Sequence, residues 1–476
     1  MSSLVLAPAT EAMGAHWTAE GAAAEAATLL DEIERFVRDA VAQLAPDPAE
    51  QARAGPGRPR VLPALGLWAG LLVGVLRGAG SQQALWRLLS VSGLWDYPRF
   101  PVTDQAVRDR LAAGGIEELV GLFRQVSALL AARVAPYADA TLAPFAAEVV
   151  ALDASTLDQL ARTLPALRGV PPGDDRLLPG KLAGRFDLRR QQWQLVRHIA
   201  DPHENDKVAA RDLLAGLPAK SLVLADLQYF AFPWFDELTE AGYHWVSRYR
   251  AKTSYEVLHT YYQEGDTFDG LVWLGAYRAD RAKHAVRLVQ YRHHGALYRY
   301  LTNVLDPTLL PLYEIARLYA RRWDFELAVK LVKRHLGLHL FWSAKPVVVQ
   351  QQVWATLCIA QILHALQLEI AGRAGVDPFE VSLALLVEYL PRLARAGQDP
   401  LALFVEQGRR AGFIRPSTRT VIRAPTIAPA QLAPVPPGLV LERPPRYAQR
   451  KCGPRPHPSP GTARRASAGG KASVHK

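Results

Sequence analysis

Residues 147–153 read AEVVALD, a short apolar run that ends in an acid. A run of this length, rich in Val and Leu, predicts a buried β-strand. Residues 221–226 read SLVLAD, so a second predicted strand also ends in an aspartate. Residues 205–217 and 233–241 lie around that second strand and are predicted to be helical. Strands mixed with helices in this order predict an α/β layer with a mainly buried sheet.

Asp153 and Asp226 stand at the C-terminal ends of these two predicted strands, where α/β sheets place their chemistry. Either aspartate alone is weak evidence, because an acid at the end of a strand often does no more than cap the next turn. A pair of such acids, followed by a glutamate on a predicted helix with basic neighbours, is more specific for a functional site.

That glutamate is Glu326, within residues 318–333, which read LYARRWDFELAVKLVK. The stretch contains no Gly or Pro and is predicted to form a helix. On a period of 3.6 residues, one polar face carries Tyr319, Arg322, Glu326, Lys330 and Lys333. The opposite face, which must be buried, carries Leu318, Phe325, Val329, Val332 and Leu336. A solvated, salt-bridged stripe is the simplest explanation of the polar face, unless other carboxylates join Glu326.

Three carboxylates that converge have a clear chemical use. Phosphodiester hydrolysis at two divalent ions, about 3.5–4 Å apart, needs about three of them, with one ion activating the nucleophile and the other stabilising the leaving oxygen. Mg²⁺ and Mn²⁺ favour such hard oxygen ligands. Carboxylates that converge without a cation repel one another, so their convergence itself indicates an ion.

The spacing Tyr319-(2)-Arg322-(3)-Glu326-(6)-Lys333 resembles the Y-R-E-K signature of bacterial insertion-sequence transposases of the DDE type. The local string RRWDFELAVKLVK is similar to that family's RW-x-x-E-x-x-x-x-x-x-K pattern. The resemblance covers roughly residues 60–400 of the chain. The order of the parts is also the family's: two strands ending in Asp, a β-rich insertion, and a helix with Glu.

Asp153 in LDAST resembles the family's first aspartate, and Asp226 in LADLQYF resembles the second. One departure concerns the residues after the second aspartate. Leu227 and Gln228 precede Tyr229 here, where the family often has Arg-Gly before the aromatic residue. This departure affects any role taken over for those two positions and leaves the carboxylate itself in place.

The resemblance implies a ribonuclease H-like mixed sheet core and a division of roles among the site residues. Catalysis and the binding of Mg²⁺ or Mn²⁺, as two ions, would fall to Asp153, Asp226 and Glu326. Contacts with DNA phosphates would fall to Tyr319, Arg322 and Lys333, and to Lys330, which shares their face but lies outside the signature. Trp245 and Trp273 are candidates for stacking on a DNA base, although burial in the core is the more common role of such residues.

The activity implied is that of a DNA transposase, which cleaves the ends of its element by hydrolysis and joins the freed 3′-hydroxyl to target DNA. Its expected partners are double-stranded DNA, as terminal inverted repeats and as target, and a second copy of the chain in the synaptic complex. Two alternatives stay open: a catalytically silent DNA-binding protein derived from a transposase, and a nuclease that cuts without joining.

Changes in composition divide the chain into four regions. They are a helical N-terminal region, 1–140; the catalytic core, 146–250 and 307–400; a β-rich insertion, 251–306; and a Pro-rich, then basic tail, 424–476, which is expected to be disordered. Residues 104–113 form a short polar helix after a turn, an order compatible with helix-turn-helix DNA binding. An ordinary helical hairpin fits this order equally well.

The net charge of +11 favours a polyanionic partner, nucleic acid before a membrane surface. Nine of the Lys and Arg residues lie after Glu442, where there is no acid, which leaves +2 for the rest of the chain. Cys358 and Cys452 are the only cysteines and lie far apart, so no disulfide framework is expected. The chain shows no signal-peptide pattern, and the apolar run at 62–76 is short for a membrane span. We therefore expect a soluble, cytoplasmic protein.

Overall fold

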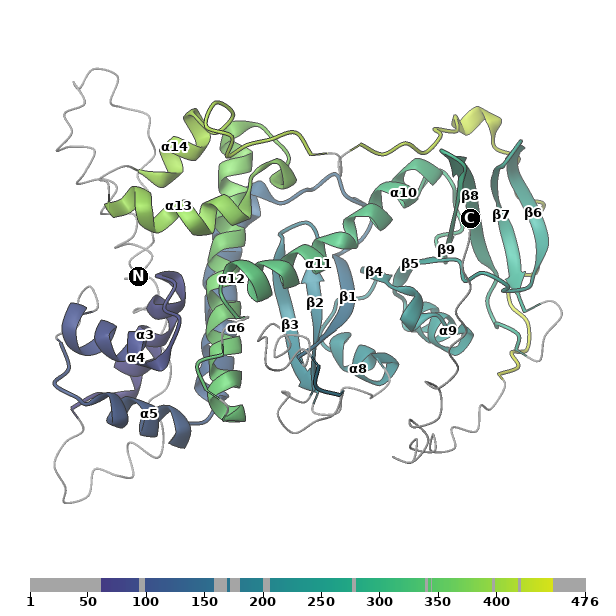
Figure 1. Ribbon diagram of the computed structural model, residues 1–476. Helices are drawn as coiled ribbons and strands as arrows, with labels where there is room; N and C mark the ends of the chain where they lie inside the picture. The colour runs from purple at the N-terminus through teal and green to yellow at the C-terminus, as the bar shows by residue number, and fades with distance from the viewer. Residues whose placement is uncertain are drawn as a thin grey trace, which may run out of the picture.

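The computed structural model describes ten stretches of the chain: residues 61–93, 99–157, 169–171, 180–199, 206–275, 280–338, 341–343, 345–395, 399–417 and 421–447. The first 60 residues of the predicted N-terminal region and the basic tail after 447 lie outside these described residues. Within them, the predicted mixed α/β architecture is confirmed (Figure 1).

A nine-stranded sheet forms the centre of the molecule, in the order β3-β2-β1-β4-β5-β9-β8-β7-β6. The strands are β1 (Val149–Thr156), β2 (Lys181–Asp187), β3 (Gln192–Ile199), β4 (Leu222–Ala225), β5 (His244–Arg248), β6 (Tyr255–Glu264), β7 (Thr267–Leu274), β8 (Val286–His293) and β9 (Ala296–Thr302). The sheet is mixed, because β1, β4 and β5 run parallel while every other pair is antiparallel.

The two strands that the apolar runs predicted lie next to each other at the centre of this sheet. All four residues of β4 are buried, which is the burial expected of a continuous apolar strand between helical layers. The first four residues of β1 are buried, and the last four, from Asp153 to Thr156, are half-buried. β1 therefore leaves the core at Asp153 and extends three residues beyond the predicted end.

The β-rich insertion is a continuation of the central sheet. β9 pairs antiparallel with β5, from Val246 opposite Thr302 to Arg248 opposite Tyr300, and β8, β7 and β6 follow as a meander. A buried ion pair fixes this extension, since Arg287 donates to both oxygens of Asp269 at 2.6 Å. Arg287 also donates to the carbonyl of Leu310 at 2.6 Å, which ties the insertion to the segment just before the following helices.

Helices cover the sheet and form a separate layer at the β3 end (Figure 1). The N-terminal helices are α3 (Ala64–Leu76), α4 (Gln82–Arg87), α5 (Asp104–Ala113) and α6 (Glu117–Val134). The core helices are α8 (Asp206–Leu213), α9 (Phe232–Glu240), α10 (Leu312–Arg321), α11 (Trp323–Lys330) and α12 (Pro346–Ala374). Two further helices, α13 (Leu383–Arg395) and α14 (Pro400–Glu406), follow α12.

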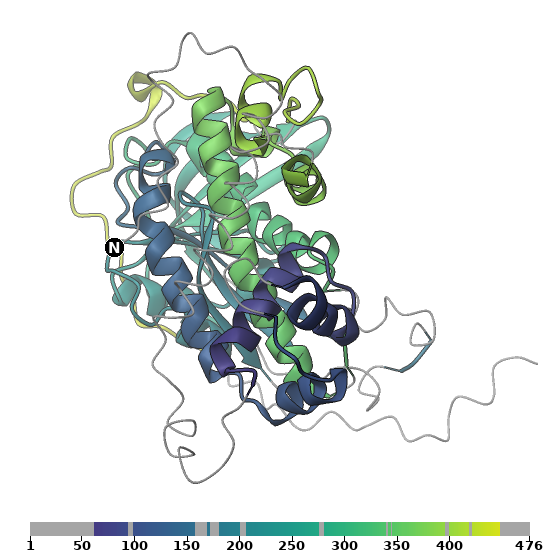
Figure 2. The same cartoon turned by 90° about the vertical axis from the view of Figure 1, so that its left-hand side faces the viewer.

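The long helix α12 joins the helical layer to the sheet, and α6 runs beside it (Figure 2). Among the described residues, α12 and residues 117–137 are long and apolar enough to cross a bilayer, but the apolar window of α12 is entirely buried inside the protein. Polar side chains of α12 hold its neighbours. Gln361 donates to the carbonyl of Trp193 at 2.8 Å and accepts from its N–H at 2.9 Å, and Arg133 of α6 pairs with Glu369.

The predicted helix at 318–333 is divided. α10 ends at Arg321 and α11 begins at Trp323, and the Arg322 N–H donates to the carbonyl of Tyr319 at 3.2 Å, a bond that tightens the chain locally. A π-helical turn, Leu331–His335, follows α11. Helical periodicity could not reveal these breaks, because no Gly or Pro marks them in the sequence.

Residues 421–447 lie along the β-rich insertion, where the tail from 424 was expected to be disordered (Figure 1). The Ala433 N–H donates to the carbonyl of Tyr261 at 2.8 Å, and the Ala285 N–H donates to the carbonyl of Leu441 at 2.8 Å. Arg443 covers the ring of Trp273 at 4.6 Å. The expectation fails for 424–447 because an extended, Pro-rich chain can pair with strand edges, which composition does not report.

Candidate active site

The first two carboxylates come from neighbouring parallel strands. Leu152 of β1 pairs with Ala225 of β4, so Asp153 and Asp226 each follow the last residue pair between these two strands. Beyond Asp226 the chain turns into a short 3₁₀ segment, Leu227–Tyr229. The register of two buried strands therefore brings the two acids together at one edge of the sheet, as their positions at the strand ends predicted.

Arg322 joins the third carboxylate to the first. Its Nη1 lies 3.1 Å from Oδ2 of Asp153, and its Nη2 lies 2.8 Å from Oε1 of Glu326. The Arg322 side chain is 7% exposed, Asp153 is 17% exposed, and Glu326 is 38% exposed. One buried guanidinium group thus lies between two acids from different elements. Of these two acids, Glu326 on α11 is the more exposed to solvent.

Electrostatics show that the three acids lie close enough to interact. Burial is the largest cause that raises the pKa of Asp153, to about 6, and the charges of Asp226 and Glu326 raise it further. The N–H of Ala154 and the charge of Arg322 act in the opposite direction. A carboxyl group buried beside two like charges holds its proton more tightly, and a nearby cation or metal ion favours its ionised form.

Tyr319 and Arg322 are more buried than a solvated face would be. The Tyr319 ring lies 5.0 Å from the ring of Tyr300 on β9, and burial raises the pKa of the Tyr319 hydroxyl. The charge of Asp226 raises this pKa further, and the charge of Arg248 lowers it. The polar face of the predicted helix therefore packs against the sheet between the active-site acids and the insertion.

Lys330 and Lys333 line a groove of about 320 Å³ next to the acids. Asp153, Glu326 and Arg334 line the same groove. The Lys333 ammonium group donates to the hydroxyl of Ser155 on β1 and lies 3.4 Å from the carbonyl of Thr156. Acids on one side and ammonium groups on the other give the groove the charge pattern that a phosphate at a metal site needs.

A second, larger cavity of about 680 Å³ lies between α10 and the strands of the insertion. Its lining includes Arg248, Tyr298, Tyr300, Tyr319 and Trp323, together with part of the C-terminal segment. The sequence did not predict this cavity, although the insertion is rich in the Tyr and Arg residues that line it. The side chains converge only because β5, β9 and α10 become neighbours in the fold.

The two tryptophans considered for base stacking lie in the core. Trp245 is fully buried and stacks on Phe235 at 4.2 Å, and Trp273 is buried under Arg443. Trp323, in contrast, is 50% exposed, next to Arg322. Burial in the core, the more common role of such residues, is therefore confirmed for both Trp245 and Trp273.

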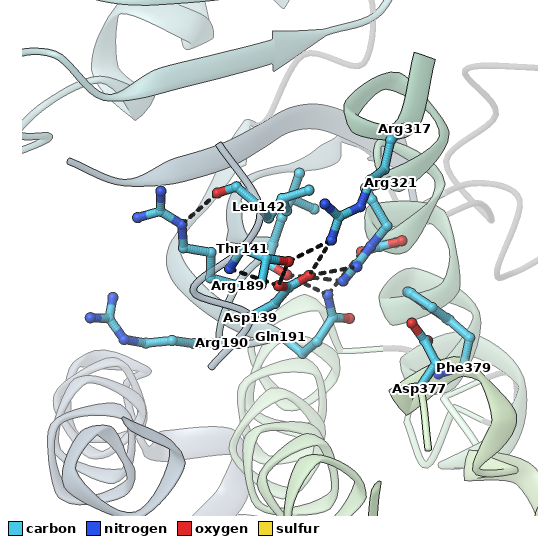
Figure 3. Close-up of polar contacts among 12 residues, drawn as sticks. Asp139, Thr141, Leu142, Arg189, Arg190, Gln191, Arg317, Arg321, Asp377 and Phe379 are labelled. Carbon is cyan, nitrogen blue, oxygen red and sulfur yellow. Dashed lines mark hydrogen bonds and ion pairs between the residues drawn. The ribbon is translucent and has the colours of Figure 1, made fainter. Parts of the chain in front are cut away.

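A polar network on the opposite side of the helix junction holds α10 and α11 in place (Figure 3). Arg317 and Arg321 both reach Asp139, at 3.3 and 3.4 Å. Arg321 also donates to Asp324 at 2.7 Å, and Gln191 donates to the same carboxylate at 2.8 Å. These contacts link the turn that carries Arg322 to the β2–β3 connection and to the segment before β1.

The donor set suits a divalent metal ion in kind, but the oxygens are not gathered around one point. Three carboxylates offer hard oxygen ligands of the type that Mg²⁺ and Mn²⁺ prefer. In the described part of the chain, however, no group of three His, Cys, Asp or Glu side chains is arranged to hold an ion as it stands. Arg322 lies between two of the acids and keeps them apart.

Residues 191–362 match the family described as "Transposase DDE domain". This range includes Asp226 and the segment from Tyr319 to Lys333, whereas Asp153 precedes it. No curated protein matches the chain. Among solved structures, the chain is similar to a piggyBac transposase in a synaptic complex with hairpin DNA, at 8% identity and a TM-score of 0.39, over 85% of this chain and 87% of that one.

Proposed function

We propose that this chain, whose residues 191–362 match the transposase DDE domain, cleaves the ends of a bacterial insertion element by metal-dependent phosphodiester hydrolysis and joins the freed 3′-hydroxyl to target DNA. The observation that carries this proposal is that Asp153 and Glu326 share the guanidinium group of Arg322, while Asp226 follows the parallel strand next to Asp153. The mixed central sheet and the order of strand, strand, insertion and helix support a ribonuclease H-like core.

In this proposal, the three carboxylates hold the metal ions, and the basic groups hold the DNA. Two divalent ions, when bound, would activate water and stabilise the leaving oxygen. Lys330 and Lys333 line the groove beside Glu326, where they can bind a phosphate of the cleaved strand. Tyr319 and Arg322 complete this surface on the side of the insertion. Burial keeps the acids in a medium of low dielectric, where their interaction with cations is strong.

Double-stranded DNA is the proposed partner, as terminal inverted repeat and as target, with two copies of the chain pairing two ends. The α4–α5 hairpin is a candidate contact with DNA, although its arginines have other partners in the protein. Arg108 pairs with Asp104 at 2.6 Å, and Arg110 donates to the carbonyl of Leu62 at 3.0 Å. Arg108 is exposed, and an exposed ion pair of this kind is easily given up to a phosphate. A cytoplasmic location belongs to the same proposal.

The test uses duplexes copied from the DNA that flanks the coding region, incubated with the full chain and Mg²⁺ or Mn²⁺. We expect strand cleavage at one end of the element, and joining of that end to a plasmid target. Glu326→Gln should lower the cleavage rate by about 10³-fold or more, because it removes a metal ligand while keeping the side-chain shape. Undiminished cleavage by this variant would falsify the assignment.

One observation favours a second candidate, a DNA-binding protein without catalysis. Arg322 lies between Asp153 and Glu326, and a permanently closed ion pair of this kind would keep a metal ion out. Specific binding of the terminal duplexes, with no metal-dependent cleavage at any Mn²⁺ concentration, would support that candidate. Cleavage without joining would instead indicate a nuclease.

A further inference from the structure

We propose that Arg322 is the resident counter-ion of the metal site in the DNA-free protein, and that metal ions load fully only after a DNA phosphate has drawn its guanidinium group away. This inference rests on the proposed function and concerns the order in which DNA and metal bind. Its basis is the position of one side chain relative to the acids that would hold the ions.

The first argument is which oxygens Arg322 uses. It reaches Oδ2 of Asp153 at 3.1 Å and Oε1 of Glu326 at 2.8 Å, with a different nitrogen for each. The other oxygen of Asp153, Oδ1, already accepts the N–H of Ala154 at 2.8 Å. Oδ2 is therefore the oxygen of Asp153 that faces a cation, and Arg322 takes that position.

The second argument is that the guanidinium group bridges two elements instead of forming a two-pronged pair with one acid. Arg322 sits at the junction of α10 and α11, Glu326 lies one turn later, and Asp153 comes from β1. A metal ion that binds Asp153 and Glu326 together must occupy the same space. The charge of one guanidinium offsets part of the repulsion among three acids, and a divalent ion would do so more completely.

The third argument is that Arg322 has an alternative place to go. It contacts two acids that line the groove, and the ring of Trp323, which is half exposed, is 5.5 Å from its guanidinium carbon. Guanidinium groups bind phosphate oxygens in a two-pronged geometry and stack on aromatic faces. A phosphate of the cleaved strand in the groove would therefore compete with the acids for Arg322 and release Oδ2 of Asp153.

A purely structural role for Arg322 predicts the opposite effect. If Arg322 only holds Glu326 in position, its removal leaves the acids less ordered, and metal ions bind more weakly. If Arg322 occupies the metal position, its removal frees that position and metal ions bind more tightly. The sign of the change in metal affinity therefore separates the two roles.

The experiment titrates Mn²⁺ into the full chain without DNA, with free Mn²⁺ followed by electron paramagnetic resonance. We expect Arg322→Gln to bind Mn²⁺ about tenfold more tightly than the wild type, the size of effect of one charge-assisted hydrogen bond. Arg322→Lys keeps the positive charge but loses the two-pronged guanidinium group, so its Mn²⁺ affinity should lie between those of the wild type and Arg322→Gln. Asp153→Asn should abolish the gain when combined with Arg322→Gln, which places the bound ion at this site.

Arg248→Gln is the matched control, because it removes one positive charge from the neighbouring cavity without touching the acids. It should leave Mn²⁺ affinity unchanged, and melting curves confirm that each variant is folded. Equal or weaker Mn²⁺ binding by Arg322→Gln overturns the inference, as does an equal gain with Arg248→Gln. If the wild type cleaves terminal DNA and this pattern is absent, only the inference fails. If the pattern holds and the wild type does not cleave, only the proposed function fails.

Discussion

Arg321 and Arg322 are neighbours at the junction of α10 and α11, and each holds carboxylates, but their surroundings differ. Arg321 contacts Asp324 and Asp139 inside a closed network and lies over the ring of Phe379 at 4.8 Å (Figure 3). Arg322 contacts acids that line an open groove. Two consecutive arginines thus face opposite sides of the same helix turn, one toward the structural support and one toward the site.

The acids that they hold show why a raised pKa alone does not identify an active site. Burial raises the pKa of Asp153 and that of Asp324 to about 6. Asp324 is enclosed and receives bonds from Arg321 and Gln191, so its oxygens are used within the protein. Asp153 lines a groove beside other acids. Access to the groove therefore separates Asp153, the proposed functional acid, from Asp324, whereas burial is the main cause of the raised pKa in both cases.

The largest expected difference between the two sides is in stability. Arg321→Gln should lower the free energy of unfolding by about 3–5 kcal/mol, because it leaves the buried Asp324 without its cation. Arg322→Gln should cost less, about 1–2 kcal/mol, because Glu326 is 38% exposed and Asp153, whose pKa is raised to about 6, can take up a proton when its cation is lost. Urea unfolding of the two variants measures both values. Equal losses of unfolding free energy in the two variants would contradict the assignment of Arg321 to structural support and of Arg322 to the site.

A smaller effect concerns pH. Burial raises the pKa of Asp324 from its ordinary value near 3.8 to about 6 in the folded protein. The contribution of its protonated form to stability is therefore complete below about pH 4 and is lost as the pH rises through 6. Asp324→Asn cannot ionise and lacks this loss. The free energy of unfolding of Asp324→Asn, relative to that of the wild type, should therefore rise by on the order of 2 kcal/mol between pH 4 and pH 7.

Urea unfolding at several pH values provides this comparison. Because Asp324 is closed off from the groove, Mn²⁺ should leave the pH dependence of this difference unchanged. A difference between Asp324→Asn and the wild type that is constant from pH 4 to pH 7, or one that Mn²⁺ reverses, would contradict the assignment of Asp324 to the structural side.

The meeting of Asp153 with Asp226 was predictable from sequence, because two buried parallel strands bring their ends to one edge of the sheet. The placement of Glu326 followed from helical spacing. The bridge formed by Arg322 was not predictable, since spacing places a side chain on a face but does not say what packs there. The break at Arg322 was likewise not predictable, because no Gly or Pro marks it in the sequence. The catalytic and DNA-binding roles of these residues stay predictions.

The supports of the site were the least visible in the sequence. Gln191 and Asp139 belong to connections with no periodic pattern. Asp139 meets Arg321, and Gln191 meets Asp324, only in the folded chain. The pairing of residues 424–447 with the insertion was equally hidden, because a Pro-rich composition indicates extended chain without saying what it contacts. Local patterns report elements and their ends, whereas long-range polar contacts depend on how those elements pack.

The most direct test of the central claim locates the metal ion on the protein itself. Fe²⁺ that replaces Mg²⁺ generates hydroxyl radicals with ascorbate and peroxide, and these radicals cut the chain next to the ion. The account predicts cuts near Asp153, Asp226 and Glu326 in the full chain bound to terminal DNA, suppressed by excess Mg²⁺ and absent in Asp153→Asn. Mg²⁺-sensitive cuts at other positions, or the same cuts in Asp153→Asn, would contradict a metal site formed by these three acids.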